Sequence, residues 1–176
     1  MTRGRRDGFT LLELALTLAL VGLMVALVVP RLGVLRSAEL DSSASRLATR
    51  IRYLREEAAL RNRWIRLAVD TREGRYRAEA LVEVEGGARF VPDERPLFRA
   101  VALPSDLRVA LDGAGVVSTP DGWLATLFAP DGFADPAVVR LDDGAGRILS
   151  VVIEPTTTKA RVVEGAVDAP RAELLP

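Results

Sequence analysis

A single carboxylate, Glu13, lies near the start of an otherwise uncharged apolar run, and this combination limits what the chain can fold into. The run from Phe9 to Val29 has 21 residues, and about 20 apolar residues are needed for a helix to span the hydrocarbon core of a bilayer. A charged side chain at mid-bilayer costs about 2.5 to 3.5 kcal/mol on insertion scales, so such a residue usually has a partner. We therefore expect a transmembrane helix over residues 9–29 in which Glu13 has a specific role.

The residues before the apolar run predict how this helix is oriented. Three arginines among residues 3–6 form a short basic segment, which by the positive-inside rule keeps the N-terminus in the cytoplasm and sends the rest of the chain outward. A secretory signal peptide would combine a shorter apolar region with a cleavage site made of small residues. The nearest candidate site, Arg36-Ser37-Ala38, has arginine where a small residue is needed, so we expect no cleavage after the apolar run.

Beyond the apolar run, the sequence predicts that the helix continues as an amphipathic segment over residues 30–62. Apolar residues recur there at steps of three and four, which is typical of one buried face of a helix. The residues of this face are Leu40, Ala44, Leu47, Ile51, Leu54 and Ala58. We expect the arginine-rich remainder to be a solvated surface with Arg and Glu pairs, the alternative being contact with phosphate or an acidic partner subunit. Serines and an aspartate over residues 37–45 weaken the pattern, but we expect the helix to continue through them.

After Asn62 the hydrophobic period changes to two, which is typical of strands. Residues 65–69 and 76–84 alternate in this way around a turn and predict a β-hairpin. Further strands are predicted at 89–91, 97–101, 107–111, 123–128, 137–141, 148–153 and 161–163. We therefore expect an α+β chain in which the amphipathic half of the long helix packs on an antiparallel sheet. The β-rich head covers residues 63–164, and residues 165–176 form a frayed tail.

The N-terminal residues Gly8-Phe9-Thr10-Leu11-Leu12-Glu13 resemble the type III prepilin signal of type IV pilins and type II secretion pseudopilins. The resemblance implies a pilin-like fold and a leader peptide formed by residues 1–8. It also implies that a membrane prepilin peptidase cuts between Gly8 and Phe9 and that the new amino group of Phe9 is methylated. Pro30 falls where these proteins commonly have a helix-kinking proline, because proline lacks the N–H and clashes with the preceding turn.

For Glu13, this resemblance leads to a hypothesis about assembly. The ammonium group of Phe9 in a neighbouring subunit can meet the Glu13 carboxylate, so that two charges that are costly in low dielectric neutralise each other. Such a pair would favour docking of subunits in register. The alternative is a glutamate that is protonated or near the lipid headgroups in an ordinary anchor.

The order of elements after the apolar run resembles the GspH/FimT-type pseudopilins, as does the segment Phe128-Ala129-Pro130-Asp131-Gly132. This resemblance implies a minor pseudopilin of the type II secretion system, anchored in the inner membrane with a periplasmic head, that enters a filament driving protein export. The implied partners are the prepilin peptidase, the major and tip pseudopilins and the inner-membrane assembly platform. The absence of cysteine points away from major type IV pilins, many of which close their C-terminal region with a disulfide.

Composition and motifs do not favour an enzyme or a bound cofactor. Histidine and cysteine are both absent, which removes the commonest general base and the commonest metal ligands. Ser150 and the only lysine, Lys159, are interpreted as an exposed serine and a solvated lysine and not as a catalytic pair. The Asp-Gly turns do not follow the ligand spacing of an EF-hand loop, so turn chemistry explains them better than calcium. The segment Asp112-Gly113-Ala114-Gly115 lacks the lysine and hydroxyl residue of a phosphate loop.

DNA binding is the main alternative function, because FimT-type minor type IV pilins that bind DNA for uptake resemble this family too. Their expected marker is a C-terminal Gly-Arg-x-Arg cluster. This chain has Gly146-Arg147-Ile148-Leu149 and later Lys159-Ala160-Arg161, so the second arginine of the cluster is missing. The formal charge is zero, from 24 basic and 24 acidic residues, and gives no general attraction to nucleic acid. We therefore do not expect nucleic-acid binding.

Overall fold

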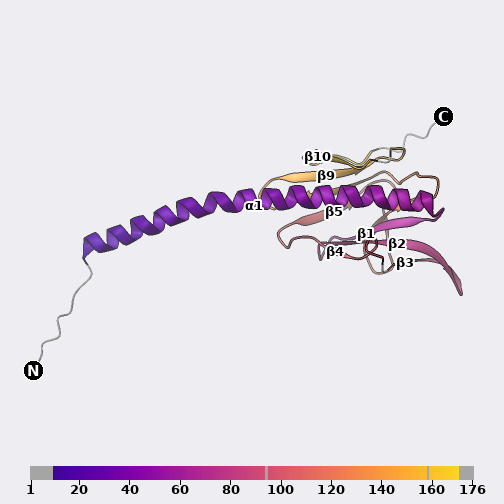
Figure 1. Ribbon diagram of the computed structural model, residues 1–176, viewed down its shortest axis with the longest axis horizontal. Helices are drawn as coiled ribbons and strands as arrows, with labels where there is room; N and C mark the ends of the chain where they lie inside the picture. Colours follow the sequence, from indigo (N-terminus) through magenta and orange to yellow (C-terminus); the bar gives the residue numbers. More distant parts are fainter. Residues whose placement is uncertain (1–9, 94, 158, 171–176) are drawn as a thin grey trace, which may run out of the picture. The chain divides into compact units, whose positions relative to one another are not determined.

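The computed structural model describes residues 10–93, 95–157 and 159–170, without the side chains of residue 25 and residues 27–36 (Figure 1). The chain divides into two compact units, residues 1–36 and residues 37–176, and each is described by itself. The second unit contains every strand that the structure describes and is called the head below.

Helix α1 (Leu11–Leu60) ends in a motif that the sequence explains. The N–H of Arg63 donates to the carbonyl of Ala58 (3.1 Å), and the N–H of Asn62 donates to the carbonyl of Ala59 (3.3 Å). Asn62 adopts a positive φ of 49°. This pattern is a Schellman motif, in which asparagine is one of the few residues that tolerate the left-handed position. The predicted end of the helix near residue 62 is therefore confirmed.

The part of α1 that belongs to the head buries one face. All six apolar residues predicted for this face are at most 2% exposed, from Leu40 to Ala58. The serine-rich stretch from residue 37 to residue 45 is helical, as predicted. Full burial of a leucine or isoleucine side chain contributes about 1.5 to 3 kcal/mol. This face therefore anchors α1 in the head.

Two antiparallel sheets form the rest of the head. The first has the order β3-β2-β1-β7-β6, with β4 paired to β2, and the second has the order β10-β9-β8-β5. The strands of the first sheet are β1 (Ile65–Asp70), β2 (Arg75–Val84), β3 (Gly87–Pro92), β4 (Val101–Ala102), β6 (Val117–Ser118) and β7 (Leu124–Phe128). Those of the second are β5 (Arg108–Asp112), β8 (Ala137–Asp142), β9 (Ile148–Ile153) and β10 (Arg161–Glu164). The predicted hairpin is confirmed as the β1–β2 pair, in register from Ile65 opposite Ala80 to Asp70 opposite Arg75.

One hydrophobic core joins both sheets to α1. It contains the buried face of the helix, the inward residues of β1, β2 and β7 from the first sheet, and those of β5, β8 and β9 from the second. In the view of Figure 1, β9 and β10 lie above the head part of α1, and β1, β2 and β3 lie below it. Phe98 and Phe128 are the largest fully buried side chains of this core. The head is therefore an α+β unit with antiparallel pairing, as predicted, but its strands form two sheets where we predicted one.

Three details of the prediction are corrected by the structure. The strand predicted at 97–101 is wrong for most of its length, because the N–H of Phe98 closes a turn onto the carbonyl of Arg95 (2.8 Å) while the Phe98 ring is buried. Strand β6 was not predicted, since two residues are too short to show a period. The tail does not fray at residue 165, because the N–H of Gly165 donates to the carbonyl of Ile148 (2.8 Å).

Candidate functional site

The first turn of α1 is capped by Thr10. Its hydroxyl oxygen accepts a hydrogen bond from the backbone N–H of Glu13 (3.2 Å), and its carbonyl accepts one from the N–H of Leu14 (3.1 Å). The sequence Thr-x-x-Glu is the pattern of a capping box, and a carboxylate in the first turn also interacts favourably with the helix dipole. Glu13 is therefore placed to help start the helix, a role that Thr10 signals in the sequence and that we did not predict.

Apolar side chains lie exposed on α1 between Leu11 and Met24. These residues are Leu11, Leu12, Leu14, Leu16, Leu18, Leu20, Val21, Leu23 and Met24, each at least 52% exposed. Their positions include consecutive residues, so they cover more than one side of the helix. A helix that is apolar on all sides is ordinarily buried in protein or lipid, and a continuous exposed apolar surface marks an interaction site. This surface therefore requires a covering partner.

Several predicted sites fall outside what the structure describes. Gly8 and Phe9, the predicted cleavage and methylation positions, are not among the described residues. Pro30 lies within the bounds of α1, but its side chain is not described, so the kink remains a prediction. Among the residues that the structure describes, no helix is both long enough and apolar enough to cross a membrane.

Two arginines of the head helix do not form the solvated surface that we expected. Arg50 is only 9% exposed, and its guanidinium donates from Nε to the carbonyl of Leu97 (2.8 Å) and from Nη2 to the carbonyl of Arg99. The same guanidinium lies 5.3 Å from the centre of the Tyr76 ring. Burial lowers the pKa of Arg50 and raises the pKa of Tyr76. Arg50 thereby fixes the loop that follows β3 against the helix.

Arg55 is a second buried arginine, and backbone carbonyls surround it. Its side chain is 3% exposed. Nε donates to the carbonyl of Gly132 (2.5 Å), Nη1 to those of Glu154 (2.8 Å) and Thr157, and Nη2 to that of Pro155. Burial lowers the pKa of Arg55. One side chain thus holds two loops, distant in sequence, against the last turns of α1.

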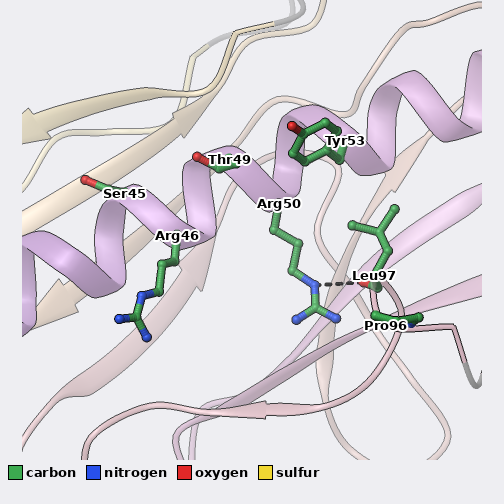
Figure 2. Close-up of a pocket in the computed structure, with 7 residues that line it drawn as sticks. All are labelled: Ser45, Arg46, Thr49, Arg50, Tyr53, Pro96 and Leu97. Atoms are coloured by element: carbon green, nitrogen blue, oxygen red, sulfur yellow. Dashed lines mark hydrogen bonds between the residues drawn. The ribbon is translucent and has the colours of Figure 1, made fainter.

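A groove lies beside Arg50, between α1 and the loop after β3. It has a volume of about 370 Å³. Its lining residues are Ser45, Arg46, Thr49, Arg50, Tyr53, Pro96 and Leu97 (Figure 2). Arg95, next to Pro96 in the loop, forms ion pairs with Glu57 of α1 (2.6 Å) and with Asp93 (2.7 Å). The pair with Glu57 therefore ties the loop wall to α1, which contributes most of the polar lining.

Arg147, which lies in the segment compared with the Gly-Arg-x-Arg marker, is paired within the head. Its two Nη atoms each lie 2.9 Å from one carboxylate oxygen of Asp41, and its Nε lies 3.4 Å from the Glu164 carboxylate. These carboxylates raise the pKa of Arg147. Arg161 is also paired, with Glu154 at 3.4 Å. Both guanidiniums would have to give up a carboxylate to bind a phosphate.

The residues considered for catalysis or metal binding have structural roles in the head. Ser150 is fully buried, and it is not the exposed serine that we expected. Its hydroxyl donates to the carbonyl of Gly165 (2.7 Å) and accepts from the N–H of Val167 (3.3 Å), so it holds the chain after β10. Asp142 and Asp143 accept N–H groups of their own turn, with Gly144 bound to Asp142 at 2.7 Å. Within the described residues, no group of three or more acidic side chains is placed to hold a metal ion.

The chain is similar to proteins of pilus and secretion systems. The family model described as "Type II transport protein GspH" matches residues 43–157. The pilin-like protein PilA1 of Thermus thermophilus is 39% identical over 158 residues, covering 89% of this chain and 98% of that protein. The type II secretion system protein H of Pseudomonas aeruginosa is 36% identical over 113 residues, which is 62% of each chain.

Solved structures with a similar fold include the minor pseudopilin EpsH from the type 2 secretion system of Vibrio cholerae. One structure of EpsH matches with a TM-score of 0.57 at 16% identity and covers 72% of this chain and 97% of EpsH. A second EpsH structure matches with a TM-score of 0.53 at 16% identity and covers 74% and 98% of the two chains. At this identity the similarity shows a shared fold.

Proposed function

Because the chain belongs to the family of the type II transport protein GspH, we propose that it is a minor pseudopilin subunit of the type II secretion pseudopilus. It assembles through its N-terminal helix into a periplasmic filament that drives protein export. The observation that carries this proposal is the match of the head, residues 43–157, to that family. The function is assembly and force transmission, without an enzymatic activity or a cofactor.

The exposed apolar residues of α1 supply a physical reason for assembly. In the proposed cycle, lipid covers residues 9–29 while the subunit is an inner-membrane protein, and the helices of neighbouring subunits cover them in the filament. Either cover removes the exposed apolar surface between Leu11 and Met24 from water. The head part of the helix stays packed on the sheets in both states.

Processing precedes assembly in this proposal. The prepilin peptidase removes residues 1–8 by cutting between Gly8 and Phe9, and Phe9 is methylated. Glu13 then sets the register by pairing with the Phe9 amine of a neighbour, and Pro30 kinks the helix. The N-terminus is cytoplasmic before cleavage and the head is periplasmic. The remaining partners are the major and tip pseudopilins and the inner-membrane assembly platform.

A minor type IV pilin is the second candidate function. The 39% identity to a pilin-like protein over 89% of the chain favours this candidate. A DNA-binding version of it has less physical support, because Asp41 and Glu164 occupy the guanidinium of Arg147. A salt-dependent mobility shift with the purified protein tests the DNA-binding version, since tight retention of DNA favours it and the absence of retention excludes it.

The proposal is tested by mass spectrometry and by secretion in one bacterial strain. In cells with an active prepilin peptidase, the membrane-extracted protein is expected to lack residues 1–8 and to begin with N-methylated Phe9. A Gly8→Val variant is expected to keep its leader and to fail to restore export in a strain that lacks this subunit. An intact leader on the wild-type protein would contradict the proposal.

A further inference from the structure

Two arginines that line the groove, Arg46 and Arg50, have no acidic partner in the part of the chain that the structure describes. Arg46 is exposed and Arg50 is buried, and neither forms an ion pair with a carboxylate there. By contrast, Arg52 on the same helix pairs with Glu56 (3.8 Å). Arg46 and Arg50 lie one helical turn apart, and their side chains extend from α1 in the same direction (Figure 2). Two like charges at this spacing repel each other, and an anion beside them would relieve the repulsion.

The charges of both arginines act on Tyr76 of strand β2. Burial raises the pKa of Tyr76, and the charges of Arg50 and Arg46 offset part of this increase. The Arg50 guanidinium lies 5.3 Å from the centre of the Tyr76 ring. Burial lowers the pKa of Arg50, and its interaction with Tyr76 offsets only part of this decrease. The groove therefore contains positive charge that its surroundings compensate only in part.

Apolar groups form much of the remaining groove surface. Pro96 and Leu97 line it from the loop, and Tyr53, which is 47% exposed, lines it from α1 (Figure 2). Tyrosine and arginine are enriched among the residues that dominate the binding energy of protein interfaces. A tyrosine ring in particular combines a large apolar surface with a polar hydroxyl. A ligand that fits this groove therefore has an acidic group beside the two arginines and an apolar group beside Tyr53 and the loop.

The loop wall of the groove is held against α1 by contacts within the head. Nε of Arg50 donates to the carbonyl of Leu97 (2.8 Å), and Arg95, next to Pro96, pairs with Glu57 (2.6 Å). A preformed site binds more tightly, because less conformational freedom is lost when the ligand arrives. The volume of about 370 Å³ is at the small end of the range for protein binding pockets. The groove therefore suits a few side chains of a loop better than a whole helix.

We propose that the groove binds an acidic loop of a different pilin-like subunit, in which a carboxylate lies next to an apolar side chain. The carboxylate faces Arg46 and Arg50, and the apolar side chain packs between Tyr53 and Leu97. A lipid headgroup would satisfy the arginines but leave the apolar wall without a partner, so the lining favours a peptide. A minor subunit has neighbours of other kinds in the filament, and one such contact per copy is enough. This inference rests on the proposed function and names the chemistry by which the head recognises a neighbour.

Photocrosslinking in cells tests the contact with the full-length chain. Tyr53 is replaced by p-benzoylphenylalanine, which keeps an aromatic ring at this position, in a strain that lacks the native subunit. We expect an adduct with another pilin-like subunit, and mass spectrometry should place the crosslink within a few residues of an aspartate or glutamate of that subunit. The matched control carries the photoreactive residue at Phe133, which is 48% exposed and does not line the groove.

The identity of the adduct decides the outcome. An adduct with a second copy of this chain or with lipid would overturn the inference, and so would a crosslinked segment without an acidic residue. An equal yield of the same adduct from the Phe133 control, or the absence of any adduct from position 53, would also overturn it.

Charge reversal shows whether the adduct depends on the arginines. Arg46→Glu changes an exposed side chain and is expected to reduce the yield of the adduct from position 53 by about fivefold. Replacing the acidic residue identified in the partner by arginine should restore the yield with Arg46→Glu. The control is Arg108→Glu, which changes an exposed arginine of β5 and should leave the yield unchanged. An unchanged yield with Arg46→Glu, or no restoration by the partner's arginine, would overturn the inference.

Processing and export of the wild-type protein are measured in the same strain. If they are normal while no charge-dependent adduct forms at the groove, this inference fails and the proposed function stands. If the wild-type protein is neither cleaved nor able to restore export, the proposed function fails whatever the adducts show.

Discussion

Each Nη atom of Arg147 lies 2.9 Å from one carboxylate oxygen of Asp41, which makes a bidentate ion pair between residues 106 positions apart in sequence. Nη1 also donates to the carbonyl of Ser37 (3.3 Å), the first residue of the head unit. The loop between β8 and β9 is thereby tied to the first turns of the head helix. Arg147, the one arginine of the incomplete Gly-Arg-x-Arg marker, therefore has a structural role in the head.

Removing the acid of this pair is expected to weaken the head slightly. Because both partners are partly exposed, the Asp41→Asn variant should show a small decrease in Tm at low salt that disappears near 1 M salt, where the Debye length is about 3 Å. Thermal unfolding at two salt concentrations measures this effect. Glu39→Gln, on the same helix and exposed, is the control and should show no salt-dependent change. An equal Tm for Asp41→Asn and wild type at low salt would show that the pair contributes nothing.

Arg55 is expected to contribute much more to the free energy of unfolding than Arg52, which lies on the same helix. Arg55→Leu removes the side-chain donor to the carbonyls of Gly132, Glu154 and Thr157 and leaves the carbonyl of Pro155 with the N–H of Ala134 alone. Each buried polar group that is left unsatisfied costs about 1 to 3 kcal/mol before relaxation. We expect a loss of at least about 3 kcal/mol in the free energy of unfolding, measured by urea titration.

The matched control is Arg52→Leu, which removes an exposed ion pair with Glu56 (3.8 Å) and should cost less than about 1 kcal/mol. Equal effects of the two variants would contradict the role assigned to Arg55.

A side chain added at Gly113 is expected to destabilise the head. Its φ is 151°, and an added Cβ would lie 2.4 Å from the carbonyl oxygen of Pro136 and 2.8 Å from the Cα of Ala137. Because these are backbone atoms, Gly113→Ala should destabilise the head by at least about 2 kcal/mol in chemical unfolding. Gly122→Ala has a positive φ of 81° but open space around the new Cβ, so it should cost only about 1 kcal/mol.

Asp135 and Asp70 are expected to affect the pH dependence of stability with opposite signs, because the pKa of Asp135 is raised and that of Asp70 is lowered. Burial raises the pKa of Asp135, and its backbone hydrogen bond with Leu127 only partly offsets this, so the folded state holds the proton more tightly than the unfolded state. The stabilisation by protonated Asp135 is complete below the ordinary value of 3.8 and is lost as pH rises through the folded pKa. The free energy of unfolding of wild type minus that of Asp135→Asn should therefore fall between pH 3 and pH 7.

For Asp70, the contribution to the free energy of unfolding should change with pH in the opposite direction. Burial would raise its pKa, but the N–H groups of Glu73 and Arg72 and the guanidinium of Arg75 together lower it. Its contribution is present above 3.8 and is lost as pH falls through the folded pKa. The difference between wild type and Asp70→Asn should therefore increase from pH 3 to pH 7. Parallel curves for the two aspartates in urea titrations would contradict both assignments.

Variants at two positions separate the possible roles of Glu13. Glutamine also serves in a capping box, so Glu13→Gln keeps the cap and removes the charge, whereas Thr10→Val removes the cap and keeps the charge. If charge pairing sets the register, Glu13→Gln should lower the amount of protein in sheared filaments severalfold and Thr10→Val should lower it little. The reverse ranking would show that Glu13 acts through the helix start, and wild-type levels for both variants would exclude both roles.

Local patterns predicted most of the head because they depend on neighbours in the chain. The period of three and four residues placed the buried face from Leu40 to Ala58 correctly, and alternation placed the β1–β2 hairpin. The prediction was wrong where apolar residues are buried without forming a strand. The apolar residues near Phe98 resembled a strand, but Phe98 lies in a turn and its aromatic ring is buried in the core.

The sequence by itself determined the long elements of this protein, the head part of α1 and the β1–β2 hairpin among them, since helical and strand periods are properties of consecutive residues. It also determined that an apolar surface with a single carboxylate needs a partner. Only the tertiary structure decided what the charged residues do. Arg50 and Arg55 looked like members of a solvated face, yet their guanidiniums bind backbone carbonyls 47 and 77 positions away. Such contacts depend on how distant segments pack, because a carbonyl has no signature in the sequence that would identify its donor.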